Sequence, residues 1–262
     1  MKLIHKFDNF IIDLDGVVYI GEKPIPGVVE TLKTLRELNK GMVFLTNDSR
    51  SSSEDFAKKL QDMGIAASPK EVLTSGMALV YYLREHYKPE GKAAFVVGSP
   101  ALKEEIRRIG LRITEGDKAN FVIVGGHPNF NYEEMKLASL AIQNGALFFG
   151  TNRDANFPTP QGLLPATGAI LTSIEVASGK RAMTAGKPEP IMMEVAKSLL
   201  PSRERMALVG DRLDTDILGG KRAGLITILV LSGITSRNDL AKSEVPPDYV
   251  IDNLAGLLKD FS

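Results

Sequence analysis

Phe10-Ile-Ile-Asp-Leu-Asp-Gly-Val-Val-Tyr19 is an apolar, β-branched run that is interrupted by two aspartates and then by a glycine. It predicts a buried strand whose carboxyl end carries acidic side chains. A helical pattern over 28–38 follows, and after it comes a second short apolar run, Gly41-Met-Val-Phe-Leu-Thr-Asn47. A strand, a helix and a strand in this order are the building block of a parallel sheet.

The same alternation continues to the end of the chain. Apolar runs predict further strands at 93–98, 121–125, 147–150, 206–210 and 225–231. Helical periodicity lies between them, at 52–63, 77–86, 100–109, 132–144, 166–178, 190–200, 214–223 and 253–261. The segment 151–165 contains three prolines and is predicted to be a loop. The pattern is typical of the α/β class with largely parallel sheets.

Composition excludes several classes of function. The chain has 262 residues, with 32 basic and 32 acidic side chains, so no excess of charge favours nucleic acid or an anionic membrane as a partner. It contains no cysteine and only three histidines, which excludes disulfides and thiolate metal sites. No apolar run reaches the ~18 residues of a membrane span, and the amino-terminal residues become charged early, so we expect a cytoplasmic protein.

Polar side chains end several of the predicted strands, where ligands of an open parallel sheet bind. Carboxylates at these ends are suited to Mg²⁺, and no imidazole or thiolate lies close by in sequence to favour zinc. A hydroxyl, an amide and a lysine can hold phosphate oxygens. The sequence therefore predicts a phosphoryl site with Mg²⁺, built from Asp13, Asp15, Asp211, Thr46, Asn47 and Lys187.

Asp13 and Asp15 have a spacing that favours two complementary roles. Residues two apart on an extended strand point the same way, so both carboxylates are expected on one face. One can attack phosphorus to form an aspartyl-phosphate. The other can protonate the leaving alkoxide and later deprotonate the attacking water.

Four motifs in order resemble those of the haloacid dehalogenase superfamily of aspartate-nucleophile phosphatases. They are Asp13-Leu-Asp-Gly-Val17, Leu45-Thr-Asn47, Gly186-Lys-Pro188 and Gly210-Asp-Arg-Leu-Asp-Thr-Asp216. The long interval between the second and third motifs resembles the motif spacing in the branch that includes NagD and the p-nitrophenyl phosphatases. The tail Leu231-Ser-Gly-Ile-Thr235 also resembles that branch. The resemblance implies a Rossmann-like parallel-sheet core at 1–78 and 184–262, with an α/β cap inserted at 79–183.

The resemblance also implies a role for each motif residue. Asp13 is the nucleophile and a Mg²⁺ ligand, and Asp15 is the general acid and base and binds the metal through its backbone carbonyl. Asp211 is the third metal ligand, while Asp216 orients metal-bound water or Lys187. Lys187 and Thr46 hold the phosphoryl group. Asp48 stands where the family often has asparagine, which leaves its role open.

Substrate choice is expected to depend on the cap, where four residues are candidates for contacting a small phosphorylated metabolite: His127, Asn152, Arg153 and Asp154. Turn chemistry is the alternative interpretation of these residues. The resemblance also allows a homodimer formed through the cap. Two other functions remain open: phosphoryl transfer to a second sugar hydroxyl, as in a mutase, and a catalytically inactive ligand-sensing protein with this fold.

Overall fold

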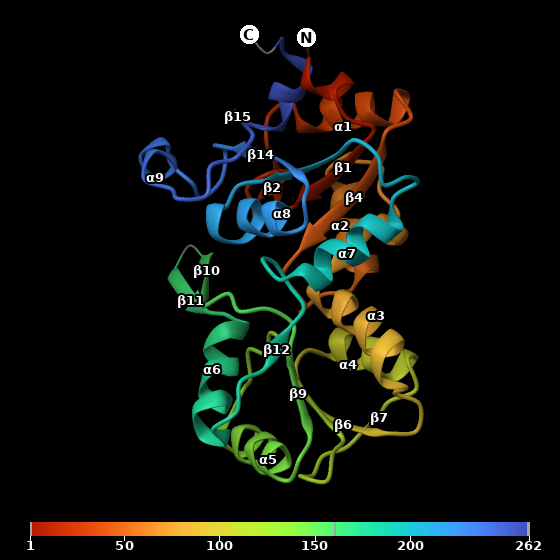
Figure 1. Ribbon diagram of the computed structural model, residues 1–262, viewed down its shortest axis with the longest axis vertical. Helices are drawn as coiled ribbons and strands as arrows, with labels where there is room; N and C mark the ends of the chain where they lie inside the picture. Colours follow the sequence, from red (N-terminus) through yellow and green to blue (C-terminus); the bar gives the residue numbers. More distant parts are fainter. Residues whose placement is uncertain (1, 160, 261–262) are drawn as a thin grey trace. The chain divides into compact units, whose positions relative to one another are not determined.

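The computed structural model describes residues 2–159 and 161–260, which fold into two compact units (Figure 1). Within these residues the core unit comprises 2–46, 53–73 and 187–260, and the inserted unit comprises 47–52 and 74–186. In the organisation predicted from the sequence, 47–52 belongs to the core and the borders lie at 78/79 and 183/184. Residues 1, 261 and 262 of the predicted core, and the last residue of the helix predicted at 253–261, lie outside the described residues.

A six-stranded sheet forms the centre of the core unit, in the order β15-β14-β13-β1-β4-β5. The strands are β1 (Asn9–Asp13), β4 (Gly41–Thr46), β5 (Val72–Thr74), β13 (Met206–Gly210), β14 (Ile226–Val230) and β15 (Tyr249–Ile251). β1 is central and pairs in parallel with β13 on one side and β4 on the other. The strand order proceeds from β1 to β4 and β5 on one side, and from β1 to β13, β14 and β15 on the other. The order therefore reverses at β1, which is the topological switch point where ligands of such folds bind.

The core sheet follows directly from the sequence pattern. All five residues of β1 are buried, as a parallel strand covered on both faces requires. Phe10, Ile12 and Phe44 belong to its main apolar cluster. Helices α1 (Val28–Glu37), α2 (Ser53–Asp62), α7 (Pro190–Leu199) and α8 (Leu218–Arg222) surround the sheet (Figure 1). Shorter elements complete the unit: η1 (Leu3–His5), η2 (Pro69–Glu71), the π-helical η3 (Leu213–Ile217), α9 (Arg237–Ala241) and the 3₁₀ helix η4 (Leu254–Leu258).

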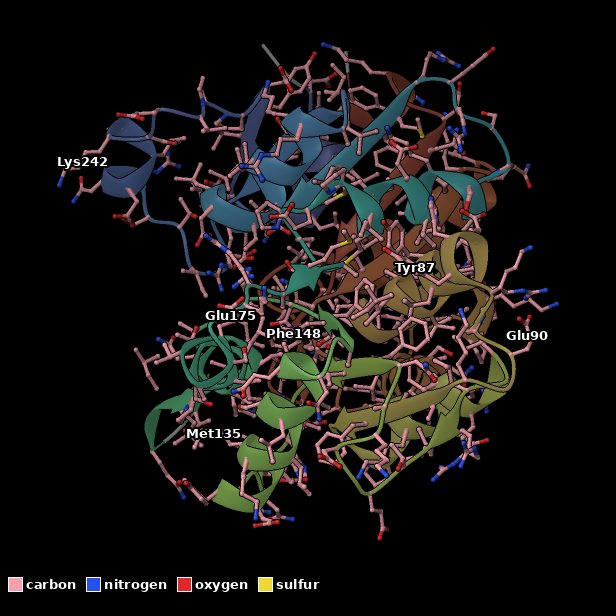
Figure 2. All side chains as sticks on the ribbon, turned by 60° about the horizontal axis from the view of Figure 1, so that its bottom comes forward. Tyr87, Glu90, Met135, Phe148, Glu175 and Lys242 are labelled. Carbon is pink, nitrogen blue, oxygen red and sulfur yellow. The ribbon has the colours of Figure 1, made fainter. Side chains whose placement is uncertain are left out.

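The inserted unit is a second parallel α/β layer structure. Its five-stranded sheet has the order β12-β9-β8-β6-β7, and each pairing is parallel. The strands are β6 (Ala93–Val97), β7 (Arg112–Ile113), β8 (Phe121–Val124), β9 (Leu147–Gly150) and β12 (Met183–Thr184), and the helices are α3 (Ser75–Tyr87), α4 (Pro100–Arg108), α5 (Tyr132–Gln143) and α6 (Thr167–Ser178). Met135 of α5 packs against the apolar cluster that contains Phe148 of β9, and both side chains are labelled in Figure 2.

The predicted fold class is confirmed, whereas the prediction of a loop over 151–165 is wrong in part. The segment predicted as a proline-containing loop holds an antiparallel hairpin, β10 (Asn156–Thr159) and β11 (Gly162–Pro165). This two-stranded ribbon tolerates proline because each strand has only one hydrogen-bonded neighbour. A second short hairpin, β2 (Tyr19–Ile20) and β3 (Lys23–Pro24), follows the first motif. In the part of the chain that the structure describes, every helix is too short or too polar to cross a membrane.

Asp248 fastens β15 to the edge of the core sheet. Its carboxylate accepts hydrogen bonds from the backbone N–H and hydroxyl of Thr227, at 2.8 and 2.9 Å, and from the Lys221 ammonium at 2.6 Å. Burial alone would raise the pKa of Asp248. The Lys221 and Thr227 donors outweigh burial, so this pKa lies below its ordinary value.

We therefore expect Asp248→Asn to lower the free energy of unfolding by about 1–2 kcal/mol at neutral pH, because an amide cannot accept all three bonds. A carboxyl group with a depressed folded pKa stabilises above its unfolded pKa, and this stabilisation is lost as the pH falls through the folded value. The difference from the parent protein should thus shrink below about pH 4 in urea unfolding.

Asp252→Asn is the matched control, because Asp252 has one ion pair with Arg237 and a side chain that is 75% exposed. Its effect should stay within about 0.5 kcal/mol. Equal stability of the two variants at neutral pH, or a difference that grows on acidification, would contradict the role of Asp248.

Candidate active site

The site begins at Asp13, the last residue of β1, whose side chain is buried at the switch point of the core sheet. Its carboxylate accepts a hydrogen bond from the ammonium of Lys187, which is also buried. The Lys187 Nζ atom lies 2.7 Å from Oδ1 of Asp216. One cation therefore joins two carboxylates from distant parts of the sequence.

Asp216 lies in η3 and is completely buried. While its Oδ1 atom pairs with Lys187, its Oδ2 atom accepts the backbone N–H groups of Asp211 and Arg212, at 3.2 and 3.1 Å. A Cβ atom at Gly210 would lie 2.2 Å from Cβ of Asp216, so only glycine fits at the end of β13. The Oδ2 atom is thus hydrogen-bonded to the backbone and the Oδ1 atom lies in an ion pair with Lys187, while the positioning role of Asp216 stays a prediction.

Asp211 follows β13, and its carboxylate packs against the backbone of Gly16, Gly233 and Ile234, which together form the Asp211 cradle. Its Oδ2 atom accepts the backbone N–H of Ile234 at 2.7 Å. Cβ atoms at Gly16 and Gly233 would lie 2.5 and 2.0 Å from this oxygen. Gly16 also has a φ of +77°, a conformation that favours glycine. The Ser232 hydroxyl donates to the Gly16 carbonyl at 2.7 Å and so joins the two walls of the cradle.

The sequence motifs alone predict no role for Gly16, Ser232 and Gly233. The available signal was a glycine directly after Asp15 and a Ser-Gly pair directly after the apolar run of β14. A glycine at the carboxyl end of a parallel strand marks a place where another group approaches the backbone closely. Here that group is the carboxylate of Asp211.

Three carboxylates converge in the described residues, because Asp13, Asp211 and Asp216 each offer an oxygen within 4.8 Å of the others. Burial raises the pKa of Asp13 well above its ordinary value, even though the Lys187 charge lowers it. Burial and the Asp216 charge raise the pKa of Asp211 to about 6. Burial alone would lower the pKa of Lys187, but Asp13 and Asp216 raise it above its ordinary value and keep it cationic.

The groups in the cluster carry an excess of negative charge. Three ionised carboxylates and one ammonium would leave two negative charges in a buried space. A divalent cation would neutralise them, and an oxygen-only donor set suits Mg²⁺. The residues present therefore fit the magnesium ion that the sequence predicts.

Asp15 is not part of this carboxylate cluster. The prediction that Asp13 and Asp15 lie on one extended strand is wrong, because β1 ends at Asp13. Leu14 is buried, whereas Asp15 is exposed and forms a backbone bridge with Tyr19. The acid–base role of Asp15 and the metal contact of its carbonyl stay predictions.

The two predicted phosphate-binding residues of the second motif belong to different units. Thr46 is buried at the end of β4, and Leu45 lies opposite Asp13, so Thr46 is at the same sheet edge as Asp13. Asn47 belongs to the inserted unit, where its amide donates to the carboxylate of Asp154 at 3.1 Å.

The four cap candidates have partners within the inserted unit. Arg153 donates to Glu175 of α6 at 2.7 Å, and Figure 2 labels Glu175 on that helix. His127 lies 3.1 Å from Glu134. The amide of Asn152 donates to the Asn47 carbonyl at 2.6 Å, and Asp154 accepts from the Asn47 side chain. These contacts describe structural roles, and contact with substrate stays a prediction for all four.

Asp48, the departure from the family motif, has a local role in the same unit. Its carboxylate accepts a hydrogen bond from Nη2 of Arg50 at 2.7 Å, and it also accepts the Arg50 backbone N–H. The Arg50 guanidinium lies 4.4 Å from the centre of the Phe157 ring in the hairpin. The negative charge of Asp48 is therefore balanced locally by Arg50.

Comparison with known proteins agrees with this geometry. Residues 10–112 match the family model of haloacid dehalogenase-like hydrolases, and residues 184–257 match a second model described as HAD-hydrolase-like. An acid sugar phosphatase of Staphylococcus saprophyticus is 34% identical over 255 residues, which cover 97% of this chain and 98% of the relative.

Solved structures of similar proteins cover nearly the whole chain. A 4-nitrophenylphosphatase from Thermotoga maritima has a TM-score of 0.91 and 36% identity, and the match covers 98% of both chains. NagD from E. coli K-12 has a TM-score of 0.88 and 36% identity, covering 95% of this chain and 97% of NagD. A glycerol phosphate phosphatase from Mycobacterium tuberculosis, solved in complex with magnesium, has a TM-score of 0.91 and 33% identity, covering 98% of this chain and 78% of that one. The chain therefore belongs to the haloacid dehalogenase-like hydrolases, in the branch that includes NagD and the p-nitrophenyl phosphatases.

Proposed function

We propose that this hydrolase is a Mg²⁺-dependent phosphatase of small phosphorylated metabolites that acts through an aspartyl-phosphate on Asp13. The observation that carries the proposal is the buried contact of Lys187 with both Asp13 and Asp216 at the switch point of the core sheet. This contact fixes a carboxylate and a cation side by side, as attack on a phosphate ester requires.

In the first step, a carboxylate oxygen of Asp13 attacks phosphorus, and the bond between phosphorus and the ester oxygen breaks. Asp15 gives its proton to the departing alkoxide. In the second step, Asp15 takes a proton from water, and the water oxygen attacks phosphorus. The bond between phosphorus and the Asp13 oxygen breaks, so that inorganic phosphate leaves and the Asp13 carboxylate is restored. The exposure of Asp15 suits it to exchange protons with substrate and solvent, whereas Asp13 is buried.

Asp13, Asp211 and the backbone carbonyl of Asp15 would hold the Mg²⁺ ion. When bound, Mg²⁺ supplies positive charge that lowers the pKa values of the carboxylates and offsets their repulsion of an anionic substrate. Asp216 keeps Lys187 and the backbone of Asp211 in place through its two oxygens. Lys187 and the Thr46 hydroxyl bind phosphoryl oxygens, and Asn47 is a further candidate donor.

The substrate class follows from the chemistry that these residues recognise. They contact a phosphoryl group, so any small phosphomonoester whose remaining part can be accommodated is a candidate. The similar proteins are named for sugar, glycerol and 4-nitrophenyl phosphates, which share only the phosphomonoester group. We therefore propose phosphomonoesters of small alcohols, sugars among them, as substrates, with water as the acceptor.

Replacing the nucleophile tests the reaction. Asp13→Asn should lower kcat for Mg²⁺-dependent release of phosphate from 4-nitrophenyl phosphate by at least about 10³-fold, because the amide is not a nucleophile. Asp15→Asn should lower it by about 10²–10⁴-fold through loss of the proton donor. Stopped assays of inorganic phosphate measure both effects and distinguish hydrolysis from transfer to another hydroxyl.

Asp8→Asn is the control for these variants. Asp8 precedes β1 at the opposite end from Asp13 and pairs with Arg205 and Lys40, so its loss should leave kcat within about twofold of the parent. An Asp13→Asn protein as active as Asp8→Asn would show that Asp13 is not the nucleophile.

The cradle of Asp211 provides a separate test of the metal site. Gly233→Ala places a Cβ atom 2.0 Å from the unmoved Oδ2 of Asp211, so the carboxylate must shift. We expect the Mg²⁺ concentration for half-maximal activity to rise about 10–100-fold, the usual cost of disturbing the support of a metal ligand. Activity lost to EDTA should return when Mg²⁺ is added.

Gly116→Ala is the matched control, because a Cβ atom there has no neighbour within 4 Å. It should titrate with Mg²⁺ like the parent. A Gly233→Ala protein with the parent's Mg²⁺ dependence would remove Asp211 from the metal site.

A further inference from the structure

Two of the places where the chain passes between the core unit and the inserted unit lie directly beside a proposed phosphate-binding residue. The first lies between Thr46 and Asn47, and the second between Gly186 and Lys187. Thr46 and Lys187 are thus bonded covalently to residues that belong to the inserted unit. Whatever fixes Asn47 and Gly186 there also restrains the backbone of Thr46 and Lys187.

Within the inserted unit, two consecutive residues hold both of these positions. The amide of Asn152 donates to the Asn47 carbonyl at 2.6 Å, and the Thr151 carbonyl accepts the Gly186 N–H at 2.7 Å. Thr151 and Asn152 follow β9 and are buried. The short segment 151–152 therefore links the two crossings to one another.

Close packing confirms that the linkage is tight. A Cβ atom at Gly186 would lie 2.7 Å from Oδ1 of Asn47, 2.8 Å from the Thr151 carbonyl oxygen and 2.9 Å from Cβ of Asn152. This packing explains why a glycine precedes Lys187. The Asn47 carbonyl also accepts the Ser75 hydroxyl at 2.6 Å, so two buried donors converge on it.

The chemistry of asparagine suits position 152. Its Nδ2 group donates to the Asn47 carbonyl, while its Oδ1 atom accepts the backbone N–H of Asp154 at 3.0 Å. An aspartate would keep the acceptor but would place a carboxylate oxygen against the Asn47 carbonyl oxygen. Alanine would lose these two bonds, together with the bond that Nδ2 donates to the Thr167 hydroxyl at 3.3 Å, and would leave the Asn47 carbonyl with one fewer donor.

We propose that Asn152 is a positioning residue that fixes the spacing of Thr46 and Lys187 by fastening Asn47 to the segment that holds Gly186. This inference rests on the proposed function of Thr46 and Lys187 as phosphate ligands. It gives Asn152 a role through the backbone, in place of contact with the substrate. Small displacements of groups that bind a reacting phosphoryl group lower the rate of its transfer strongly.

The test compares Asn152→Ala, Asn152→Asp and Ser75→Ala with Asn131→Ala. Asn131 caps α5 in the same unit by accepting the N–H of Glu134 at 3.1 Å, so its loss disturbs the unit at another place. Two kinds of measurement are made at a temperature where circular dichroism shows each variant to be folded. They are kcat and KM for 4-nitrophenyl phosphate with Mg²⁺, and amide hydrogen exchange in peptides spanning 44–50 and 184–190.

For Asn152→Ala we expect kcat to fall about 10–100-fold with KM within about threefold of the parent, because ground-state binding changes less than positioning in the transition state. Exchange at 184–190 should accelerate about tenfold as the segment holding Gly186 loosens. Asn152→Asp should show the same pattern more strongly and Ser75→Ala more weakly. Asn131→Ala should change neither quantity.

Parent-like exchange at 184–190 in Asn152→Ala would overturn the linkage, and faster exchange with parent-like kcat would overturn the positioning role. An equal fall of kcat in Asn131→Ala would assign the effect to general destabilisation and overturn the proposal as well. If the parent protein released no phosphate, the proposed function would fail, whereas the exchange measurements would still decide whether Asn152 links the two crossings.

Discussion

The buried Lys187 ammonium between Asp13 and Asp216 is the interaction on which the other features of the site depend. Burying a carboxylate is costly unless a cation and hydrogen bonds compensate for its lost hydration. Lys187 must therefore reach the end of β1 from a distant part of the chain. Because Asp216 holds both Lys187 and the backbone of Asp211, the third and fourth motifs cannot move independently of one another.

The strand order of the core sheet makes this meeting of distant motifs possible. β1 lies between β4, which follows it closely in sequence, and β13, which comes after the inserted unit. All three strands end at one edge, so their terminal residues meet there although much of the chain separates them. The same architecture gives the inserted unit covalent attachments beside Thr46 and Lys187, and these attachments connect its internal packing with the site.

The local sequence pattern is sufficient for the α/β class, for most helices, and for the acidic residues at strand ends, because periodicity and strand-end chemistry are local properties. It predicts the strands β1, β4, β6, β8, β9, β13 and β14, but not the short strands or the two hairpins. The local pattern is insufficient where contacts between residues distant in sequence determine the structure. Hydrogen bonds to Asn47 and Ser49 hold the segment 47–52 in the inserted unit, and the sequence pattern of that segment does not predict these bonds. The end of β1 at Asp13 leaves Asp15 exposed, which the spacing of two did not indicate. Glycine is required at positions 16 and 233 because the Asp211 carboxylate packs against their backbone, and this contact is visible only in the folded structure.

The central claim is that Asp13 receives the phosphoryl group. Its most direct test is mass spectrometry of the enzyme quenched in acid during turnover of 4-nitrophenyl phosphate with Mg²⁺, followed by digestion. We expect a peptide containing Asp13 that carries one added phosphoryl group and loses it on treatment with hydroxylamine. A phosphoryl group found on another residue would contradict the account. So would its absence throughout turnover, provided that a known aspartyl-phosphate enzyme yields a labelled peptide under the same quench.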